Sequence, residues 1–440
     1  MTRSRNSKSL VNLSNKSRRT MTNTRDLRKL ILLFQVLALI TVLFLHDEVP
    51  YKHRIIFAGF LIIGVYAANY FAPRITKGDN YILLIALMLF SIGSIMIYRL
   101  EPSLAIRQVI WLGVGIIAYF ATYMILKYIK GWEKRGLLYF FLILALFIIT
   151  LLFGSVRGGA QNWIVIGGES GFMIQPVEFI KIILVFLVAY NYSHYEKMKE
   201  ISIAGHKVGN YLLMAAVYLF IGMLFLQAEL GTALIFYALL FLTQFIYEEN
   251  KKQILINLGL AIVGSVIAYM LFDHIKIRVH TWLDPWKDID NTGYQITQSL
   301  FAIGSGGFFG SGIGMGKPEL IPRAYTDFIF SAICEEMGIF AGIGVIMLFL
   351  LLVYRGFKIA LSQENKFYSI VALGISINFA IQAFIIFGGV LKLIPLTGIT
   401  VPFVTYGGSS ILASFIALGI LQYTSGQIPK MEVDENAKNE

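Results

Sequence analysis

The sequence predicts an all-α fold, a polytopic membrane bundle of about twelve transmembrane helices. The chain of 440 residues is 57% hydrophobic and only 14% charged, and its mean hydropathy is +0.70, whereas soluble domains are about 25% charged. Long uncharged runs recur, such as LLYFFLILALFIITLLFG at 137–154. A helix needs about 20 apolar residues to cross the hydrocarbon, and an open sheet cannot satisfy its backbone in lipid. These runs are therefore expected to be helices.

Twelve segments fit this description. In chain order, the expected spans are 28–45, 55–71, 81–98, 108–128, 137–154, 176–191, 210–226, 231–247, 254–272, 326–354, 366–391 and 409–424. Because successive spans cross the membrane in opposite directions, every second loop lies on the side of the N-terminus. These loops are basic, as in KYIKGWEKR at 127–135 and EENKK at 248–252. Cytoplasmic loops carry an excess of Lys and Arg, so both chain ends are expected in the cytoplasm.

The net charge of +11 does not point to nucleic acid, because much of it lies at one end. Residues 1–29 hold nine Lys and Arg against one acid. We expect residues 1–27 to form a disordered basic cytoplasmic tail that can touch anionic lipid, and residues 427–440 a second cytoplasmic tail. The single cysteine, Cys334, excludes an intramolecular disulfide and a cysteine metal site. No protein-held metal site is expected.

Three connections are unusually long, at about 155–175, 273–325 and 392–408, and alternation places all three on the exterior. Compact proteins keep connections short unless the loop has a function. The exterior end is therefore where the chemistry is expected.

The first long connection carries Arg157, Gln161 and Trp163, and the next span begins QPVEFIKI. Glu178 and Lys181 are three residues apart and so share one helix face. The pair is either an interfacial ion pair, with Lys181 reaching outward to water, or part of a functional polar cleft. Glu229, in LQAELGTAL at 226–234, is equally open to two interpretations: a helix cap or a functional group.

The second long connection combines polar residues with a glycine-dense run. Arg278, Gln298, Ser299 and Arg323 are its candidate binding residues. QITQSLFAIGS is apolar at helical intervals and predicts a short amphipathic helix on or in the membrane. GSGGFFGSGIGMG matches neither a Walker A nor a dinucleotide motif, and the aspartates at 284, 288 and 290 lack the calcium-binding EF-hand pattern.

Three carboxylates open the span that follows, in YTDFIFSAICEEMG at 325–338. Asp327 could simply be an N-cap or first-turn acid. That explanation does not cover Glu335 and Glu336, which point about 100° apart on a helix. We expect at least one of them to face the protein interior, and both to pair with cations such as Lys181 or Lys392. In the third connection, prolines and glycine interrupt an apolar segment, which predicts a broken backbone buried in protein or lining a cavity.

Five spaced motifs together resemble the SEDS family, which comprises the RodA, FtsW and SpoVE proteins. They are GAQNWI with QPVEFIKI, QAELGTAL, DPW followed by GYQITQSLFAIGSGGFFGSGIG, IPRAYTDFIFSAICEEMG, and IPLTGITVPFVTYGGSS. The resemblance covers about residues 81–426 and implies a ten-helix catalytic membrane domain there, preceded by two additional helices within 28–80. This chain has QAE and TYGGSS where the family usually has QPD and SYGGSS, so it resembles a less typical member.

The resemblance implies a peptidoglycan glycosyltransferase that polymerises lipid II at the outer face of the bacterial cytoplasmic membrane, for cell shape, division or sporulation. Its partner would be a class B penicillin-binding protein that crosslinks the strands. The resemblance also makes Asp327 the essential acid and places Trp163, Glu178 and Lys181 in the cleft.

The chemistry of such a site can be argued from its residues. A hydroxyl is a poor nucleophile, so Asp327 would act as general base, while Arg157, Lys181, Arg278 and Arg323 would offset the pyrophosphate charge. A divalent ion, Mg²⁺ or Mn²⁺, could assist, and no organic cofactor is expected. Two alternatives are a flippase for lipid-linked precursors and a non-catalytic scaffold of a division or elongation complex. The clustering of polar groups on one side favours catalysis.

Overall fold

The computed structural model describes residues 25–43, 50–157, 159–167, 172–203, 206–207 and 209–428. Most of the predicted N-terminal tail and of the predicted C-terminal tail lies outside the described residues. In the described part, ten helices are long and apolar enough to cross a membrane. They are α2 (Tyr51–Ile75), α3 (Tyr81–Leu100), α4 (Pro102–Tyr128), α5 (Gly136–Phe153), α6 (Pro176–Ser193), α9 (Leu230–Tyr247), α10 (Lys251–Leu271), α13 (Ile329–Leu361), α14 (Lys366–Val390) and α15 (Gly408–Ser425).

The two remaining predicted spans are also helical. They are residues 25–43 and α8 (Gly209–Leu226). The predicted all-α membrane bundle is therefore confirmed, with differences at the helix ends. The largest is in α13, which runs from Ile329 to Leu361 instead of spanning 326–354. It begins later than predicted because residues 321–328 form turns, and it continues past the predicted end to Leu361.

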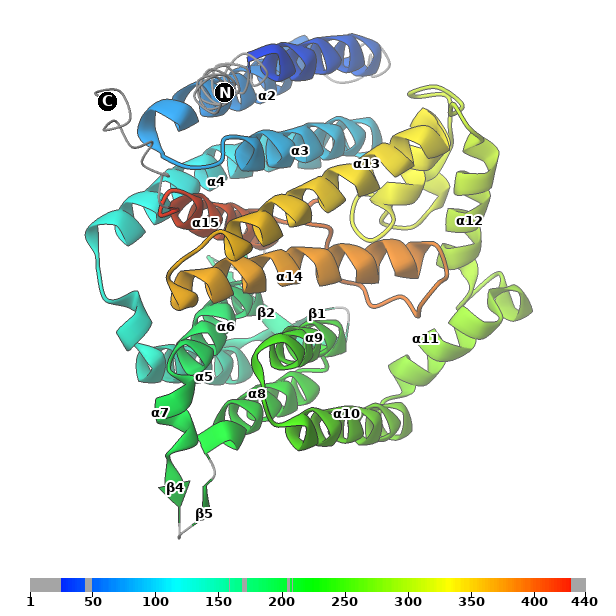
Figure 1. Cartoon of the computed structure of the whole chain (residues 1–440). Helices are drawn as coiled ribbons and strands as arrows, with labels where there is room; N and C mark the ends of the chain where they lie inside the picture. The colour runs from blue at the N-terminus through cyan, green and yellow to red at the C-terminus, as the bar shows by residue number, and fades with distance from the viewer. Residues whose placement is uncertain are drawn as a thin grey trace, which may run out of the picture.

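Helices α3, α6, α14 and α15 form the buried centre of the bundle, while α10 lies at its edge with most of its surface exposed. In Figure 1, α13 and α14 lie side by side and α3 lies between α2 and α13. The central helices bury small and polar side chains, such as Ser91 and Ser94 of α3, which permits close helix packing in a membrane.

The connections divide between two ends of the bundle. The η1 turn (Trp132–Lys134), α7 (Tyr195–Lys199) and the paired strands β4 (Ser202–Ile203) and β5 (His206–Lys207) lie at one end. At the opposite end, to the right in Figure 1, are α11 (Asp273–Leu283), α12 (Tyr294–Gly306) and the segments around them, η2 (Pro285–Asp288) and η3 (Pro318–Leu320). We call this opposite end the loop end.

One local feature departs from an all-α fold. The first long connection folds into a three-stranded antiparallel sheet of β1 (Ser155–Arg157), β2 (Ala160–Ile166) and β3 (Phe172–Ile174), in the order β1-β2-β3. The strands β2 and β3 are rich in β-branched and aromatic residues, which favour extended structure. The sheet pairs the described strands of the first connection with one another at the loop end.

The predicted amphipathic helix is α12, and its buried face packs against α13. The predicted broken segment is also present, as residues 391–407 form no helix. Its centre is buried, with Val401, Phe403 and Val404 each 1% exposed. A Cβ added at Gly93 of α3 would lie 2.2 Å from the carbonyl oxygen of Val404. The broken backbone is therefore enclosed by protein, as expected for irregular structure at membrane depth.

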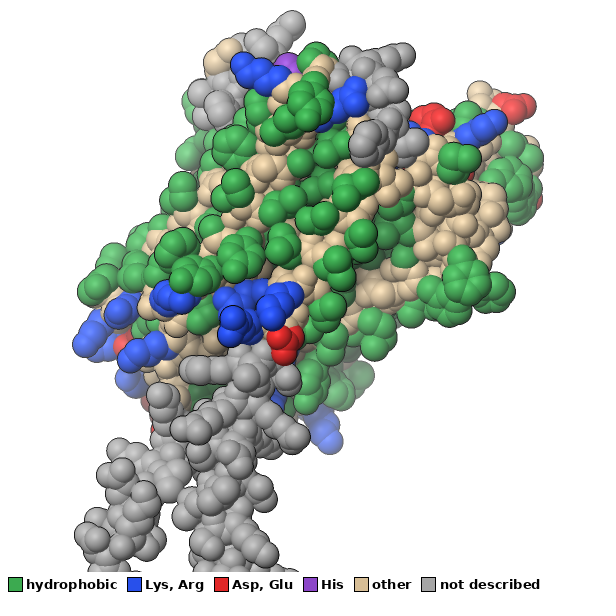
Figure 2. Space-filling model, turned by 90° about the horizontal axis from the view of Figure 1, so that it is seen from above, with side chains coloured by type: hydrophobic (Ala, Val, Ile, Leu, Met, Phe, Trp, Pro, Cys, Tyr) green, Lys and Arg blue, Asp and Glu red, His purple; other side chains and the backbone are tan. Residues whose placement is uncertain are grey.

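The surface of the bundle is that of a membrane protein. Figure 2, seen from the α2 side, shows hydrophobic side chains over the middle of the molecule and Lys and Arg gathered toward its two ends. Large apolar side chains are exposed along α5 and α10, for example Phe141, Leu152, Leu255 and Met270. The chain is therefore a multi-pass membrane protein.

Candidate active site

The three long connections meet at the loop end. Gln175, where β3 leads into α6, donates its backbone N–H to Ser409 Oγ at 3.1 Å. From the second connection, Arg278 Nη1 donates to the carbonyl oxygen of Thr397 at 2.6 Å. The backbone N–H of Tyr406 donates to the carbonyl oxygen of Tyr325 at 3.1 Å. Segments that are far apart in the sequence thus form one site.

Asp327 lies just before α13, beside the broken segment. The N-cap of α13 is Phe328, which makes no side-chain capping bond, so Asp327 is neither the N-cap nor a first-turn acid. A Cβ added at Gly398 would lie 3.7 Å from Asp327 Oδ2 and 3.3 Å from Arg278 Nη2. The carboxylate and the guanidinium therefore share the space over Gly398.

The ionisation of Asp327 reflects two opposing effects. Burial raises the pKa of Asp327 to about 6, although the positive charges of Arg278 and Arg323 oppose this rise. Desolvation lowers the pKa of Arg278, against the opposing effect of Asp327 and Glu229. Asp327 is thus a carboxylate that takes up and releases a proton near neutral pH.

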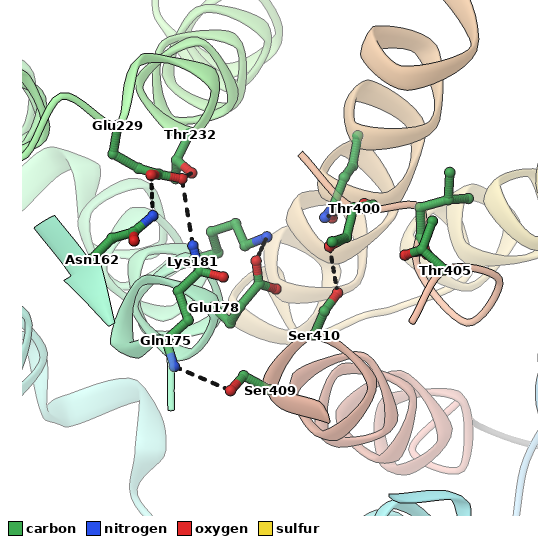
Figure 3. A network of polar contacts seen from close by, with 12 residues as sticks. Asn162, Gln175, Glu178, Lys181, Glu229, Thr232, Thr400, Thr405, Ser409 and Ser410 are labelled. Atoms are coloured by element: carbon green, nitrogen blue, oxygen red, sulfur yellow. Dashed lines mark hydrogen bonds and ion pairs between the residues drawn. The ribbon is translucent and has the colours of Figure 1, made fainter. Parts of the chain in front are cut away.

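A second polar cluster joins the sheet to α6 and α9 (Figure 3). Glu178 and Lys181 form an ion pair of 2.9 Å and are 7% and 4% exposed. Glu229 accepts hydrogen bonds from Asn162 of β2, from Thr232 at 3.2 Å and from Gln175 at 3.5 Å. Lys181 is thus paired inside the bundle and does not reach outward to water.

The two clusters are electrostatically coupled through Glu229. Burial raises the pKa of Glu229; the hydrogen bonds from Asn162 and Thr232 lower it, Glu178 raises it and Lys181 lowers it. Since Glu229 also acts on Arg278, charges of alternating sign run from Glu178 to Asp327. They are, in order, Glu178, Lys181, Glu229, Arg278 and Asp327.

Comparison with known proteins identifies the family. The profile FTSW_RODA_SPOVE, described as cell cycle protein, matches residues 79–428. The chain belongs to the SEDS family. It is 36% identical over 381 residues to the peptidoglycan glycosyltransferase RodA of Mycobacterium tuberculosis (strain H37Rv), covering 81% of this chain and 79% of that protein. It is 34% identical over 361 residues to the stage V sporulation protein E of Bacillus subtilis, covering 79% and 96%.

Solved structures share the fold. One of them aligns with a TM-score of 0.66 at 24% identity, covering 79% of this chain and 97% of that chain. It is described as "Structural coordination of polymerization and crosslinking by a peptidoglycan synthase complex". The rod shape determining protein RodA of Thermus thermophilus aligns with a TM-score of 0.58 at 22% identity, covering 80% and 98%. The helices before residue 79 lie outside the family match.

Three predicted site residues of the first connection lie in the three-stranded sheet. Trp163 is half-buried in β2. Gln161 Nε2 donates to the carbonyl oxygens of Leu151 and Gly154 at 3.0 and 3.1 Å, so this side chain is committed to the end of α5. Arg157 ends β1, and its side chain lies outside the described residues.

The binding residues predicted from the second connection have different surroundings in the structure. Arg323 is exposed, with a φ of 55°, and its charge acts on Asp327. Ser299 is buried and its hydroxyl lies 2.7 Å from that of Ser331, which ties α12 to α13. Gln298 is half-buried on the same helix. Ser299 is therefore positioned for packing between helices.

The predicted partners of Glu335 and Glu336 are wrong. Glu336 pairs with Arg99 of α3 at 3.0 Å, and Glu335 accepts the backbone N–H of Lys317 at 2.7 Å. Lys181 forms its ion pair with Glu178, and Lys392 Nζ donates to the carbonyl oxygen of Leu283 at 3.5 Å. The partners come from α3 and from residues 307–317, which we call the glycine-rich loop. Sequence spacing relates neither of them to α13.

Glu229 and Asn162 complete the site. From the sequence, Glu229 stayed open between a helix cap and a functional group, and Asn162 was not selected. The available signal was the turn QAELG, in which Ala228 has a φ of 57° and aims Glu229 back at the sheet. A short acidic turn between two spans is also typical of a cap, so the pattern alone could not decide.

The loop aspartates serve turns. Asp284 accepts the backbone N–H of Trp286 at 3.2 Å, and Asp288 accepts bonds from Asn291 and Thr292, which lower the pKa of Asp288. Among the described residues, no three His, Cys, Asp or Glu side chains are placed to hold a metal ion.

Gly398→Ala is expected to impair the site locally. Gly398 has a φ of +74°, and the new Cβ would lie 3.3 Å from Arg278 Nη2. The left-handed conformation costs an alanine roughly 1–2 kcal/mol, and the guanidinium must shift. We expect a small loss of thermal stability and a larger loss of activity. Gly59→Ala, where an added Cβ meets nothing within 4 Å, is the control.

Proposed function

We propose that this protein polymerises lipid-linked disaccharide-peptide units, lipid II, into glycan strands. Its membership of the SEDS family and its relatives named peptidoglycan glycosyltransferase support this reaction. The observation that carries it is Asp327, a half-buried carboxylate with a pKa of about 6 that lies beside Arg278, where three long connections converge. A general base works best when its pKa lies near the working pH.

In the proposed reaction, the 4-hydroxyl of the acceptor sugar attacks the anomeric carbon of the donor. Asp327 takes the hydroxyl proton, the new glycosidic bond forms, and the bond to undecaprenyl pyrophosphate breaks. The pyrophosphate is a good leaving group and needs no protein acid. Arg278, Arg323, Arg157 and Lys181 supply positive charge for the developing negative charge.

The network from Glu178 to Arg278 orients these groups. Lys181 is held by Glu178, and Arg278 by the carbonyl of Thr397. Fixed charges in a water-poor site stabilise a transition state more than mobile ones do. A divalent cation, Mg²⁺ or Mn²⁺, would accompany the pyrophosphate, and no step of the proposed reaction depends on it.

The loop end faces the exterior in this proposal. The loops at the opposite end carry the basic residues of KYIKGWEKR and EENKK, and such loops stay in the cytoplasm. The glycan strands would pass to a class B penicillin-binding protein for crosslinking, in keeping with the family resemblance.

The distribution of buried charge favours catalysis over transport. Glu178, Lys181, Glu335 and Glu336 are the charged residues buried in the described part of the chain, and all lie in the N-terminal part of α6 or α13, at the loop end. A flippase needs a polar path across both leaflets. Purified protein, with and without its transpeptidase partner, tests the choice. Glycan chains made from lipid II support polymerisation; movement of lipid II across proteoliposomes without polymer supports transport.

The rate is expected to depend on pH through Asp327. The carboxylate must be ionised to accept a proton, so the rate of polymerisation should fall as the pH drops through about 6 and level off above it. Arg278 lowers the pKa of Asp327, so Arg278→Gln should shift the fall in rate to higher pH. A rate that is flat from pH 5 to 8 would contradict the assignment. Initial rates with lipid II in mixed buffers measure this dependence of the rate on pH.

A further inference from the structure

Helix α13 is divided at Gly338, where φ is 85° and ψ is 167°. Its first part, together with Asp327, is the segment 327–337, which we call the Asp327 segment. Because of the break, the carbonyls of Glu335 and Glu336 accept N–H groups from another part of the chain, Ser311 at 2.9 Å and Gly312 at 3.0 Å. In return, Ile339 and Phe340 donate to the carbonyls of residues 307 and 308 at 2.9 and 3.3 Å. The glycine-rich loop thus replaces the lost helical hydrogen bonds.

Charged side chains reinforce this contact. Glu336 Oε1 lies 3.0 Å from Arg99 Nε; the Glu336 side chain is 0% exposed and that of Arg99 14%. Arg99 Nη2 also donates to the carbonyl oxygen of Gly316 at 3.4 Å. A Cβ at Gly310 would lie 2.3 Å from the carbonyl oxygen of Glu336. Arg99 therefore joins the Asp327 segment and the glycine-rich loop to α3.

Helix α3, which carries Arg99, is well packed in the bundle. It is one of the most buried spans, and the two additional N-terminal helices brace it. Tyr98, next to Arg99, is 0% exposed and stacks on Phe57 of α2 with ring centroids 4.4 Å apart. Gln35, in the helix at 25–43, donates to Ser91 of α3 at 2.8 Å.

We propose that Arg99 is a positioning residue that, through Glu336, fixes the Asp327 segment in its productive place. The inference rests on the proposed function. Glu336 is nine residues from Asp327, roughly 13 Å along a helix, so Arg99 is remote from the reacting atoms. The break at Gly338 uncouples the segment from the long part of α13, and the ion pair to α3 supplies the missing constraint. A misplacement of about 1 Å can lower a rate about 100-fold.

Substitutions in the full-length chain test the inference. Glu336→Gln removes the ion pair while keeping side-chain size, Arg99→Gln removes it with a shorter polar side chain, and Arg99→Lys keeps the charge. Glu319→Gln is the matched control, because Glu319 lies 3.7 Å from Arg99 with 58% of its side chain exposed. We would measure kcat and KM for lipid II polymerisation, and amide hydrogen exchange in residues 307–317 and 329–337.

We expect Arg99→Gln and Glu336→Gln to lower kcat about 10- to 100-fold, with KM within about twofold of wild type. Exchange in both segments should rise, Arg99→Lys should recover much of kcat, and Glu319→Gln should behave as wild type. The double substitution should be no worse than the poorer single one, since both remove one interaction.

An unchanged kcat, or a raised KM with kcat intact, would overturn the inference, and so would unchanged exchange. If the wild type makes no polymer at all, the proposed function fails, while the exchange measurement still tests the ion pair. If Arg99→Gln does not fold, Arg99→Lys and Glu336→Gln decide the matter by the same criteria.

Discussion

Asp327→Asn is expected to reduce lipid II polymerisation about 10²- to 10⁴-fold, the usual contribution of a general base. The amide keeps the size of the carboxylate but cannot accept the hydroxyl proton. Because Asp327 is held beside Arg278 and Gly398, the substitution should change the rate and leave the fold in place. The measurement is glycan chain formation by purified protein with its transpeptidase partner.

Asp290→Asn is the matched control, an exposed acid in the same connection that should leave the rate unchanged. Substrate binding should persist in Asp327→Asn, so that the loss appears in kcat. If Asp327→Asn polymerises within about twofold of wild type, Asp327 is not the base, and Glu229, a second half-buried carboxylate of the site, becomes the candidate.

Lys181→Met is expected to destabilise the protein by about 3–5 kcal/mol, because removing one partner of a buried ion pair leaves the other charge uncompensated. Glu178 and Lys181 are 7% and 4% exposed, so water cannot replace the lost partner. Thermal unfolding in detergent should show a clear decrease in the melting temperature.

The double substitution Glu178→Gln with Lys181→Met separates charge from packing. Removing both charges leaves no isolated ion, so most of the lost stability should return. Activity should stay low, because the coupling of Lys181 to Glu229 is gone. If the double substitution is as unstable as Lys181→Met alone, the effect belongs to packing and not to the buried charge.

The family and the spans follow from local patterns. Hydrophobic length finds each helix of the bundle, and motifs such as TDF and QPVEFIKI indicate the SEDS family before any contact is known. The pair of Glu178 and Lys181 was also predictable, since three residues on one helix place two side chains together. The domain boundaries at 80 and 426 and the two cytoplasmic tails stay predictions.

The partners of distant residues required the fold. Sequence spacing sets neighbours only within a helix, so it could not relate Arg99 to Glu336, which are far apart along the chain. For the same reason Glu229 looked like a turn residue until β2 brought Asn162 to it. Gly338 could pass as an ordinary helix residue, because only the approach of residues 307–312 makes its left-handed backbone necessary.

The sequence alone determined the membrane environment, the helices and the family, because each depends on composition or on residues close together in the chain. It also singled out Asp327 as the candidate base. Tertiary structure alone decided which charges face one another. The strength of a charge interaction depends on separation and burial, and both are set by the packing of helices that are distant in the sequence. Arg278 and the 391–407 segment therefore lie beside Asp327 only in the assembled bundle.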